Sequence, residues 1–210
     1  TFITANRDGT ITKVTFQPKF RQSSKRITRL EITAMAYEIE DFNITRNSSF
    51  GKRQCLSRII LGTSTGDILI LSKDLELITT LHQKHFDRII KIQFFDFNKY
   101  FLTASNDGSL KIFNARSDLY EYVSSFYEHQ GYITDFSISP DQKTFITACT
   151  DQKLRLFDIK KKLCLAIIGP FPYVPTKILF HPEGKHYFIG FTNGVVACYK
   201  VRGATKVLSV

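Results

Sequence analysis

The side chains in this sequence that could carry out acid–base chemistry recur at a constant spacing. His85 and His129 are 44 residues apart, and so are Asp107 and Asp151. Two carboxylates could serve as a general acid and a general base, and histidines could bind a metal or move a proton. The even spacing favours a repeated structural role instead, because histidines so far apart lack the close pairing of zinc motifs. The aspartate series also decays to Asn193, which a turn tolerates and catalysis does not.

Other catalytic patterns are missing from the sequence. It contains no Gly-x-x-x-x-Gly-Lys-Ser/Thr phosphate loop, no Gly-x-Ser-x-Gly elbow and no His-Glu-x-x-His motif. The cysteines have no Cys-x-x-Cys spacing, so buried, reduced thiols are favoured over a disulfide or a zinc site. We therefore expect a protein that is not an enzyme and has no cofactor, no metal and no small-molecule substrate.

The elements that must position these residues are repeats of about 42 residues. In each repeat an apolar run leads through a polar turn into an alternating strand that ends in an aromatic residue, as in Thr103–Asn114, Thr147–Asp158 and Ile189–Lys200. Leu61–Ser72 is a further copy, and a weaker one opens the chain at Ile3–Thr15. A four-stranded unit of this length cannot bury both its faces, so neighbouring copies must cover one another.

Radial stacking of such units predicts an all-β fold, a β-propeller of four-stranded antiparallel blades. We place the blades near 30–81, 85–126, 129–168 and 172–210, with a partial blade before them. A single domain would then cover residues 1–210 with about five blades, and we expect this set to be incomplete because the chain opens in the middle of a blade. A parallel β-helix, the structural alternative, would have a much shorter repeat.

The repeats resemble those of the WD-repeat β-propeller family, over nearly the whole chain and most clearly over residues 82–201. Family units carry a His before the first strand, an Asp in the turn between strands two and three, and a Trp-Asp pair at the end of strand three. The resemblance implies that a structural relay is formed by His85, Asp107, Phe113, His129, Asp151, Phe157 and Tyr199. The sequence has no Trp, so the relay cannot end on an indole N–H, and we expect it to be incomplete.

The net charge of +10 is concentrated in two stretches without acidic residues. We interpret them as loop insertions near residues 18–29 and 43–55, exposed and dispensable for folding, because they interrupt the regular period. Their basic residues are Lys19, Arg21, Lys25, Arg26, Arg29, Arg46, Lys52 and Arg53, with Arg58 just beyond. Such loops could contact RNA phosphates or acidic protein surfaces.

The function that the sequence favours is a protein-interaction scaffold that organises a multi-protein complex through its propeller faces, as the family resemblance also implies. Two alternatives remain open: a structural component of an RNA–protein assembly such as a ribosome-biogenesis particle, and a ciliary or cytoskeletal scaffold. We expect a cytoplasmic protein, nucleolar or ciliary in the alternatives, whose partners are other proteins and which does not insert into membranes. The loops of the partner-binding face would present Phe86, Arg88, Asn106, Tyr132, Thr150, Tyr173 and Asn193.

Overall fold

Antiparallel sheets make up the whole of the regular structure that is described. The computed structural model describes residues 2–15, 20–38, 58–201 and 206–209, and every regular element in these residues is a strand. Within them there is no helix that is long and apolar enough to cross a membrane. The strands form one three-stranded and four four-stranded sheets, in each of which strands that follow one another in sequence pair antiparallel.

The five sheets follow one another along the chain. The first sheet holds β1 (Phe2–Ala5), β2 (Thr10–Thr15) and β3 (Arg21–Arg26). The second holds β4 (Ile32–Tyr37), β5 (Arg58–Thr63), β6 (Ile68–Ser72) and β7 (Leu77–Leu81). The third holds β8 (Ile89–Phe95), β9 (Tyr100–Ser105), β10 (Leu110–Asn114) and β11 (Tyr122–Phe126). The fourth holds β12 (Ile133–Ile138), β13 (Thr144–Cys149), β14 (Leu154–Asp158) and β15 (Leu163–Ile168). The fifth holds β16 (Pro175–Phe180), β17 (His186–Phe191), β18 (Val196–Lys200) and β19 (Lys206–Ser209).

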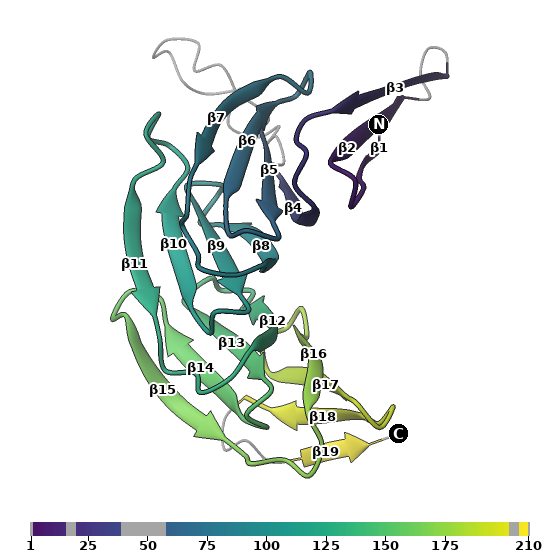
Figure 1. Ribbon diagram of the computed structural model, residues 1–210. Helices are drawn as coiled ribbons and strands as arrows, with labels where there is room; N and C mark the ends of the chain where they lie inside the picture. Colours follow the sequence, from purple (N-terminus) through teal and green to yellow (C-terminus); the bar gives the residue numbers. More distant parts are fainter. Residues whose placement is uncertain (1, 16–19, 39–57, 202–205, 210) are drawn as a thin grey trace.

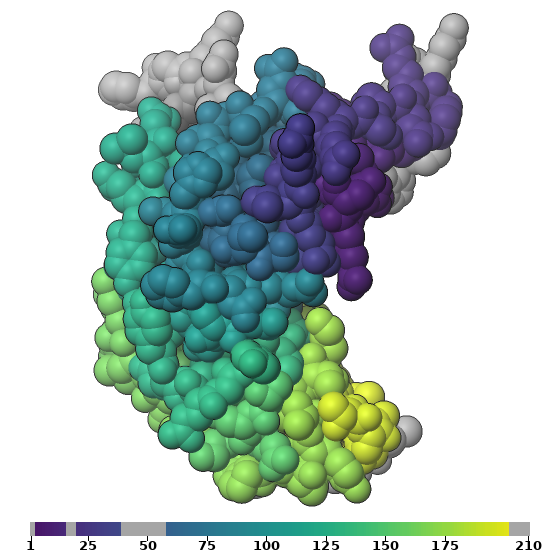
Figure 2. Space-filling view, viewed as in Figure 1, coloured from purple at the N-terminus to yellow at the C-terminus, as the bar shows by residue number. Residues whose placement is uncertain are grey.

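The sheets stack face to face into an open arc (Figure 1). The first strands of the four-stranded sheets approach one another, β4 against β8 and β12 against β16, while β7, β11 and β15 lie toward the convex side. A space-filling view shows the same arc, hollowed between the first sheet and the fifth (Figure 2). These four-stranded blades confirm the all-β propeller architecture predicted from the repeat.

The hydrophobic core is divided into clusters that lie between neighbouring sheets. One cluster joins the third and fourth sheets through Phe126, Phe136, Phe145 and Phe157, all of them at most 1% exposed. Further clusters join the second sheet to the third, the fourth to the fifth, and the first to the second. Each blade is therefore stabilised by its neighbours, because a single sheet would leave one apolar face in water.

The turns between strands two and three of each blade need a left-handed residue. Gly66 and Gly108 have φ of 84° and 80°, and a Cβ on Gly66 would come within 2.1 Å of the His85 carbonyl oxygen. Gln152 holds the equivalent place in the fourth sheet with φ of 64°. The same left-handed turn position therefore recurs in these three repeats, at Gly66, Gly108 and Gln152, as the repeat of about 42 residues predicts.

The interpretation of residues 18–29 as a loop insertion is wrong. Residues 21–26 form β3, which pairs with β2 along its full length, from Thr15 opposite Arg21 to Thr10 opposite Arg26. All six residues of β3 are exposed, because β3 is the outermost strand of its sheet and has solvent on both faces. Such a strand buries no apolar face, so its sequence shows no alternation of apolar and polar residues. The second predicted insertion, 43–55, lies outside the described residues.

Candidate functional site

A hydrogen-bond network around His85 ties the third sheet together at the end of the blade that carries the Asp107 turn. The imidazole is 1% exposed; its Nδ1 lies 3.2 Å from Asp107 Oδ2 and its Nε2 lies 2.8 Å from Thr103 Oγ1. Asp107 also accepts from the Ser109 hydroxyl at 2.6 Å and from the Phe86 N–H at 2.9 Å. Nδ1–H therefore donates to the carboxylate, which leaves Nε2 to accept from the Thr103 hydroxyl.

Burial and hydrogen bonding set the charges of this pair. Burial lowers the pKa of His85, and the neighbouring Asp107 only partly offsets that effect. For Asp107, burial alone would raise the pKa, but the hydrogen bonds from His85, Ser109 and the Phe86 N–H hold it well below its ordinary value. The carboxylate is thus committed to its own turn as a charged acceptor, and no proton is poised there for acid–base catalysis.

The relay stops at the backbone of strand three, where the family pattern would place an indole. In the fourth sheet, Thr147 accepts from His129 and donates its hydroxyl proton to the Arg155 carbonyl oxygen at 3.2 Å. In the third sheet, the Thr103 hydroxyl also lies 3.2 Å from a carbonyl oxygen, that of Lys111, but its proton is directed to His85 Nε2. Aromatic residues in the equivalent positions stack on the strand beside them instead. The ring centroids are 5.2 Å apart for Phe101 and Phe113, 4.9 Å for Phe145 and Phe157, and 5.8 Å for Tyr187 and Tyr199. The aromatic positions therefore contribute packing rather than a hydrogen-bond donor.

Arg155 enters the relay of the fourth sheet and separates the two residues that touch in the third. Its Nη1 lies 2.6 Å from Asp151 Oδ2 and 2.9 Å from His129 Nδ1. A guanidinium can only donate, so His129 Nδ1 is the acceptor and its Nε2–H donates to Thr147 Oγ1 at 2.9 Å. His85 and His129 therefore carry their proton on opposite ring nitrogens.

The charges around Arg155 follow from its burial. Arg155 is 2% exposed. Burial, followed by the Arg155 charge, lowers the pKa of His129 to about 4. Burial would raise the pKa of Asp151, but the ion pair with Arg155 outweighs it and lowers that pKa. At neutral pH the site holds one ion pair and a neutral imidazole.

The same cluster includes the one group of potential metal ligands found in the described part of the chain. Ligand atoms of His129, Cys149 and Asp151 lie within 4.8 Å of one another. The Arg155 guanidinium bonds to two of these three groups, and burial raises the pKa of Cys149 to about 11, which keeps the thiol protonated. A metal ion would need the lone pairs that the guanidinium already uses, so the donor set does not fit one.

The residues predicted for the partner-binding face comprise four polar residues and three aromatic ones, and the polar ones all form contacts within the protein. Asn193 and Thr150 accept backbone N–H groups within their own blades, from Val195 at 3.2 Å and from Tyr132 at 2.9 Å. Asn106 donates its N–H to the Arg88 carbonyl at 3.0 Å, and the Arg88 side chain forms an ion pair with Glu31 at 2.9 Å.

The aromatic members of that face carry large exposed side chains. Phe86 is 90% exposed, Tyr132 59% and Tyr173 49%, each from the loop before the first strand of its blade. The Phe86 N–H is fixed by Asp107, and Lys111 Nζ lies 5.7 Å from the ring centroid of Phe86. Thr150 and Asn193 are exposed as well, but their side-chain oxygens already accept backbone N–H groups, so the three aromatic residues offer the larger apolar contact area.

Of the basic residues singled out in the sequence, Arg21, Lys25, Arg26 and Arg29 are exposed. Lys19, Arg46, Lys52 and Arg53 lie outside the described residues. Arg58, which was grouped with them, is 9% exposed and belongs to the interior. It pairs with Glu38 at 3.1 Å and donates to Tyr120 Oη at 2.9 Å, because a buried guanidinium needs a carboxylate and acceptors around it.

Two features of the structure had no counterpart in the sequence argument. Arg155 occupies the position of Lys111 in the preceding repeat, so a repeat alignment read for charge could have marked it. A cavity between the third and fourth sheets is bordered by Lys160, Lys161 and Lys162. The run of three lysines was the available signal for that cavity.

Comparison with known proteins agrees with the fold. Residues 75–114 and 120–158 match the model of the family described as WD domain, G-beta repeat. This match identifies two WD repeats in the chain, over residues 75–114 and 120–158, and the four-stranded blades of the structure agree with it. Proteins of this family generally mediate protein interactions within complexes, and their repeats are typically non-catalytic.

Several curated proteins are similar to parts of this chain. Pre-mRNA-processing factor 19 of Oryza sativa subsp. japonica is 26% identical over 149 residues, which cover 70% of this chain and 28% of that protein. SIR4-interacting protein SIF2 of Saccharomyces cerevisiae is 30% identical over 120 residues, 56% of this chain and 22% of that protein. Guanine nucleotide-binding protein subunit beta-1 of Nicotiana tabacum is 29% identical over 107 residues, 48% of this chain and 27% of that protein. This chain thus spans less than a third of the length of these relatives.

Proposed function

We propose that this protein is a non-catalytic scaffold that holds partner proteins through the aromatic loop face, which we define as Phe86, Tyr132 and Tyr173. The observation that carries the proposal is the exposure of these three large rings on consecutive blades, at 90%, 59% and 49%. Aromatic side chains lose little conformational entropy on binding and bury much area, so they dominate many interfaces.

The surroundings of these rings support binding without rearrangement. The backbone N–H of Phe86 is held by Asp107 and that of Tyr132 by Thr150, both at 2.9 Å. A surface whose backbone is already ordered has less entropy to lose when a partner binds. Two of the similar proteins are named for association with other proteins: SIR4-interacting protein SIF2 and a guanine nucleotide-binding protein subunit. That association comes to this chain as part of the proposal.

The test is quantitative affinity capture from cells with the full-length protein. A variant with Phe86→Ser, Tyr132→Ser and Tyr173→Ser should keep its melting temperature, because exposed side chains contribute little to the core. Recovery of its main co-purifying proteins should fall by about tenfold or more, as the loss of hot-spot residues predicts. Leu119→Ser is the matched control, since Leu119 is 76% exposed in the connection between β10 and β11, away from the aromatic loop face. The same partners recovered in the same amounts from the triple variant would refute the proposal.

A further inference from the structure

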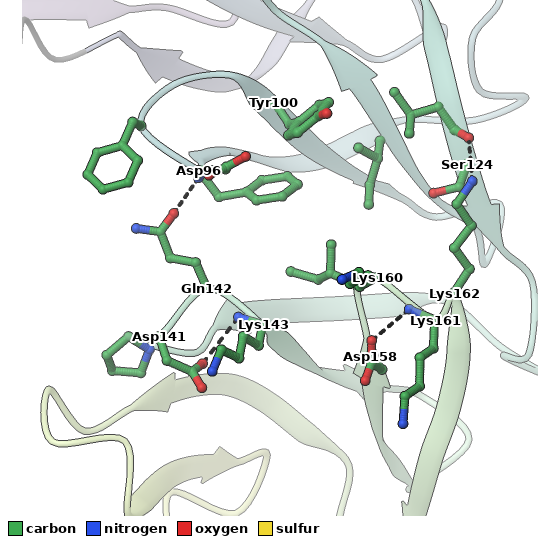
Figure 3. A pocket seen from close by; sticks show the side chains of 16 residues that line it. Asp96, Tyr100, Ser124, Asp141, Gln142, Lys143, Asp158, Lys160, Lys161 and Lys162 are labelled. Atoms are coloured by element: carbon green, nitrogen blue, oxygen red, sulfur yellow. Dashed lines mark hydrogen bonds between the residues drawn. The ribbon is translucent and has the colours of Figure 1, made fainter.

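A cavity opens between the third and fourth sheets at the end of the blades opposite the relay turns. Its lining residues come from the turns β8–β9, β12–β13 and β14–β15 and from the strands beside them, and its volume is about 840 Å³ (Figure 3). β9 begins with Tyr100 in the lining of this cavity and ends at Ser105, next to the Asp107 turn. The cavity and the aromatic loop face are therefore separated by the full length of a strand.

The inner part of the cavity is apolar and pre-formed. Phe95 is 6% exposed and stacks on Tyr100 with ring centroids 5.6 Å apart, and Ile112 beside them is 2% exposed. At the mouth, Phe97 is 68% exposed, and its carbonyl accepts from Arg116 Nη2 at 2.8 Å. A backbone N–H of Asp96 donates to Gln142 Oε1 and links the two blades across one wall (Figure 3).

The rim on the side of the fourth sheet is positively charged. Lys143, Lys160 and Lys161 are exposed, and their ammonium groups form no ion pair with any described residue. The nearby carboxylates are engaged in the turns: Asp141 accepts from Ser139 Oγ at 2.6 Å and Asp158 from the Lys161 N–H at 2.7 Å. The third carboxylate, Asp96, lies beside Gln142 and away from Lys161 and Lys162 (Figure 3).

A buried hydroxyl in the lining has no partner. Ser124 is 6% exposed and its Oγ makes no hydrogen bond within the described structure. Buried hydroxyl groups are almost always hydrogen-bonded, and an acceptor placed in the cavity would satisfy this one. The neighbouring Lys162 Nζ is fixed instead by the Val123 carbonyl oxygen at 3.1 Å.

We propose that this cavity binds a short acidic segment of a partner protein that inserts a large apolar side chain. The apolar side chain would lie against Phe95, Tyr100 and Ile112, and its flanking carboxylates would meet Lys143, Lys160 and Lys161. A backbone carbonyl of the segment would accept from Ser124. The volume falls within the range of about 300–1,000 Å³ that holds whole ligands, so more than one residue of the segment can enter.

The distribution of polar groups favours a peptide over a small anion. Phosphate or a similar ion needs several donors around it, whereas the lining has only two side-chain hydroxyl groups, those of Tyr100 and Ser124, and the cations lie on the exposed rim. An apolar centre with a polar, charged rim is the usual anatomy of a protein–protein contact. The site does not depend on the aromatic loop face, so either proposal can fail alone.

The test selects ligands from a phage-displayed library of random dodecapeptides on the full-length protein. Enriched sequences should carry Phe, Leu or Ile next to Asp or Glu. Synthetic peptides of these sequences should bind the Lys160→Ser, Lys161→Ser variant about tenfold more weakly, and the difference should shrink at high salt. Ser124→Leu, which fills the cavity, should abolish binding. Lys73→Ser with Lys200→Ser, two exposed lysines outside the cavity, should leave binding unchanged.

The following results would each overturn the proposal that this cavity binds an acidic peptide segment. No enrichment, enrichment of sequences without an apolar side chain, or equal binding to the lysine variant would each contradict it. So would preferential binding of a small amphiphile such as dodecanoate, with no peptide bound. The triple variant of the aromatic loop face must bind the selected peptides as the wild type does, which separates this result from the test of the scaffold.

Discussion

Arg155 and Lys111 occupy equivalent positions in two repeats but make different contacts, because Arg155 bonds within the relay and Lys111 donates to the Lys84 carbonyl oxygen. In the third blade Asp107 contacts His85 directly, whereas in the fourth Arg155 lies between Asp151 and His129. A buried guanidinium needs a counterion, since a lone charge in the interior loses its hydration without compensation. Asp151 supplies that counterion. Both aspartates accept a backbone N–H within their own turn, but the side chain that each one contacts differs: His85 for Asp107 and Arg155 for Asp151.

Asp151→Ala should therefore destabilise the protein by about 3–5 kcal/mol, because it leaves the Arg155 charge buried and unpaired. Replacing both residues, Asp151→Ala with Arg155→Met, should restore at least half of that loss. Urea denaturation of the two variants and the wild type measures both values. A single variant as stable as the wild type would contradict the ion pair.

His129 should make stability depend on pH. Its pKa is lowered to about 4 in the folded protein, against about 6.5 for an unfolded chain, so the unfolded state binds the proton more readily. The contribution of neutral His129 is complete above about pH 6.5 and is lost as pH falls toward 4. His129→Gln should flatten this part of the stability profile, measured as unfolding free energy between pH 7 and 4. An unchanged slope would show that the imidazole is not buried in its neutral form.

At the scale of the element, β3 is a strand made entirely of polar residues. Its six residues pair with β2 over its whole length, and all are exposed. Lysine and arginine on an outermost strand discourage another chain from adding to the sheet edge. The basic side chains of β3 are thus compatible with a structural role as well as with binding to RNA or an acidic surface.

Deletion and substitution of β3 should have different effects. Removing residues 21–26 should lower the melting temperature, because β2 loses its backbone partner. Arg21→Thr, Lys25→Thr and Arg26→Thr should leave it within a few degrees, because threonine suits a strand and no buried contact is lost. Thermal unfolding followed by circular dichroism distinguishes the two. If the substituted strand melts like the deletion, its charges and not its backbone pairing stabilise the sheet.

For the whole molecule, the innermost strands are linked by polar contacts that reach across blades. Asp135 in β12 is 4% exposed; it accepts from Lys91 of β8 at 2.8 Å and from the Ile178 N–H of β16 at 3.2 Å. Thr134 donates to the Pro175 carbonyl at 2.6 Å, and Thr33 makes the same contact with Ile89 at 2.5 Å. These bonds and the inter-sheet apolar clusters hold the blades at one angle, which in turn defines both the aromatic loop face and the cavity at the opposite end.

Local pattern in the sequence was enough to predict the blades, their turns and the aromatic residue that ends the third strand of a blade. Each of these depends on residues within one repeat: the left-handed position at Gly108, the alternation of Leu110 and Ile112, and the aromatic at Phe113. The strand β3 could not be predicted in this way, because its backbone pairing requires no apolar side chain. The insertion of Arg155 and the cavity beside Ser124 were decided by tertiary structure alone. Both depend on which atoms of sequence-distant segments meet in the interior, and the repeat period carries no information on that.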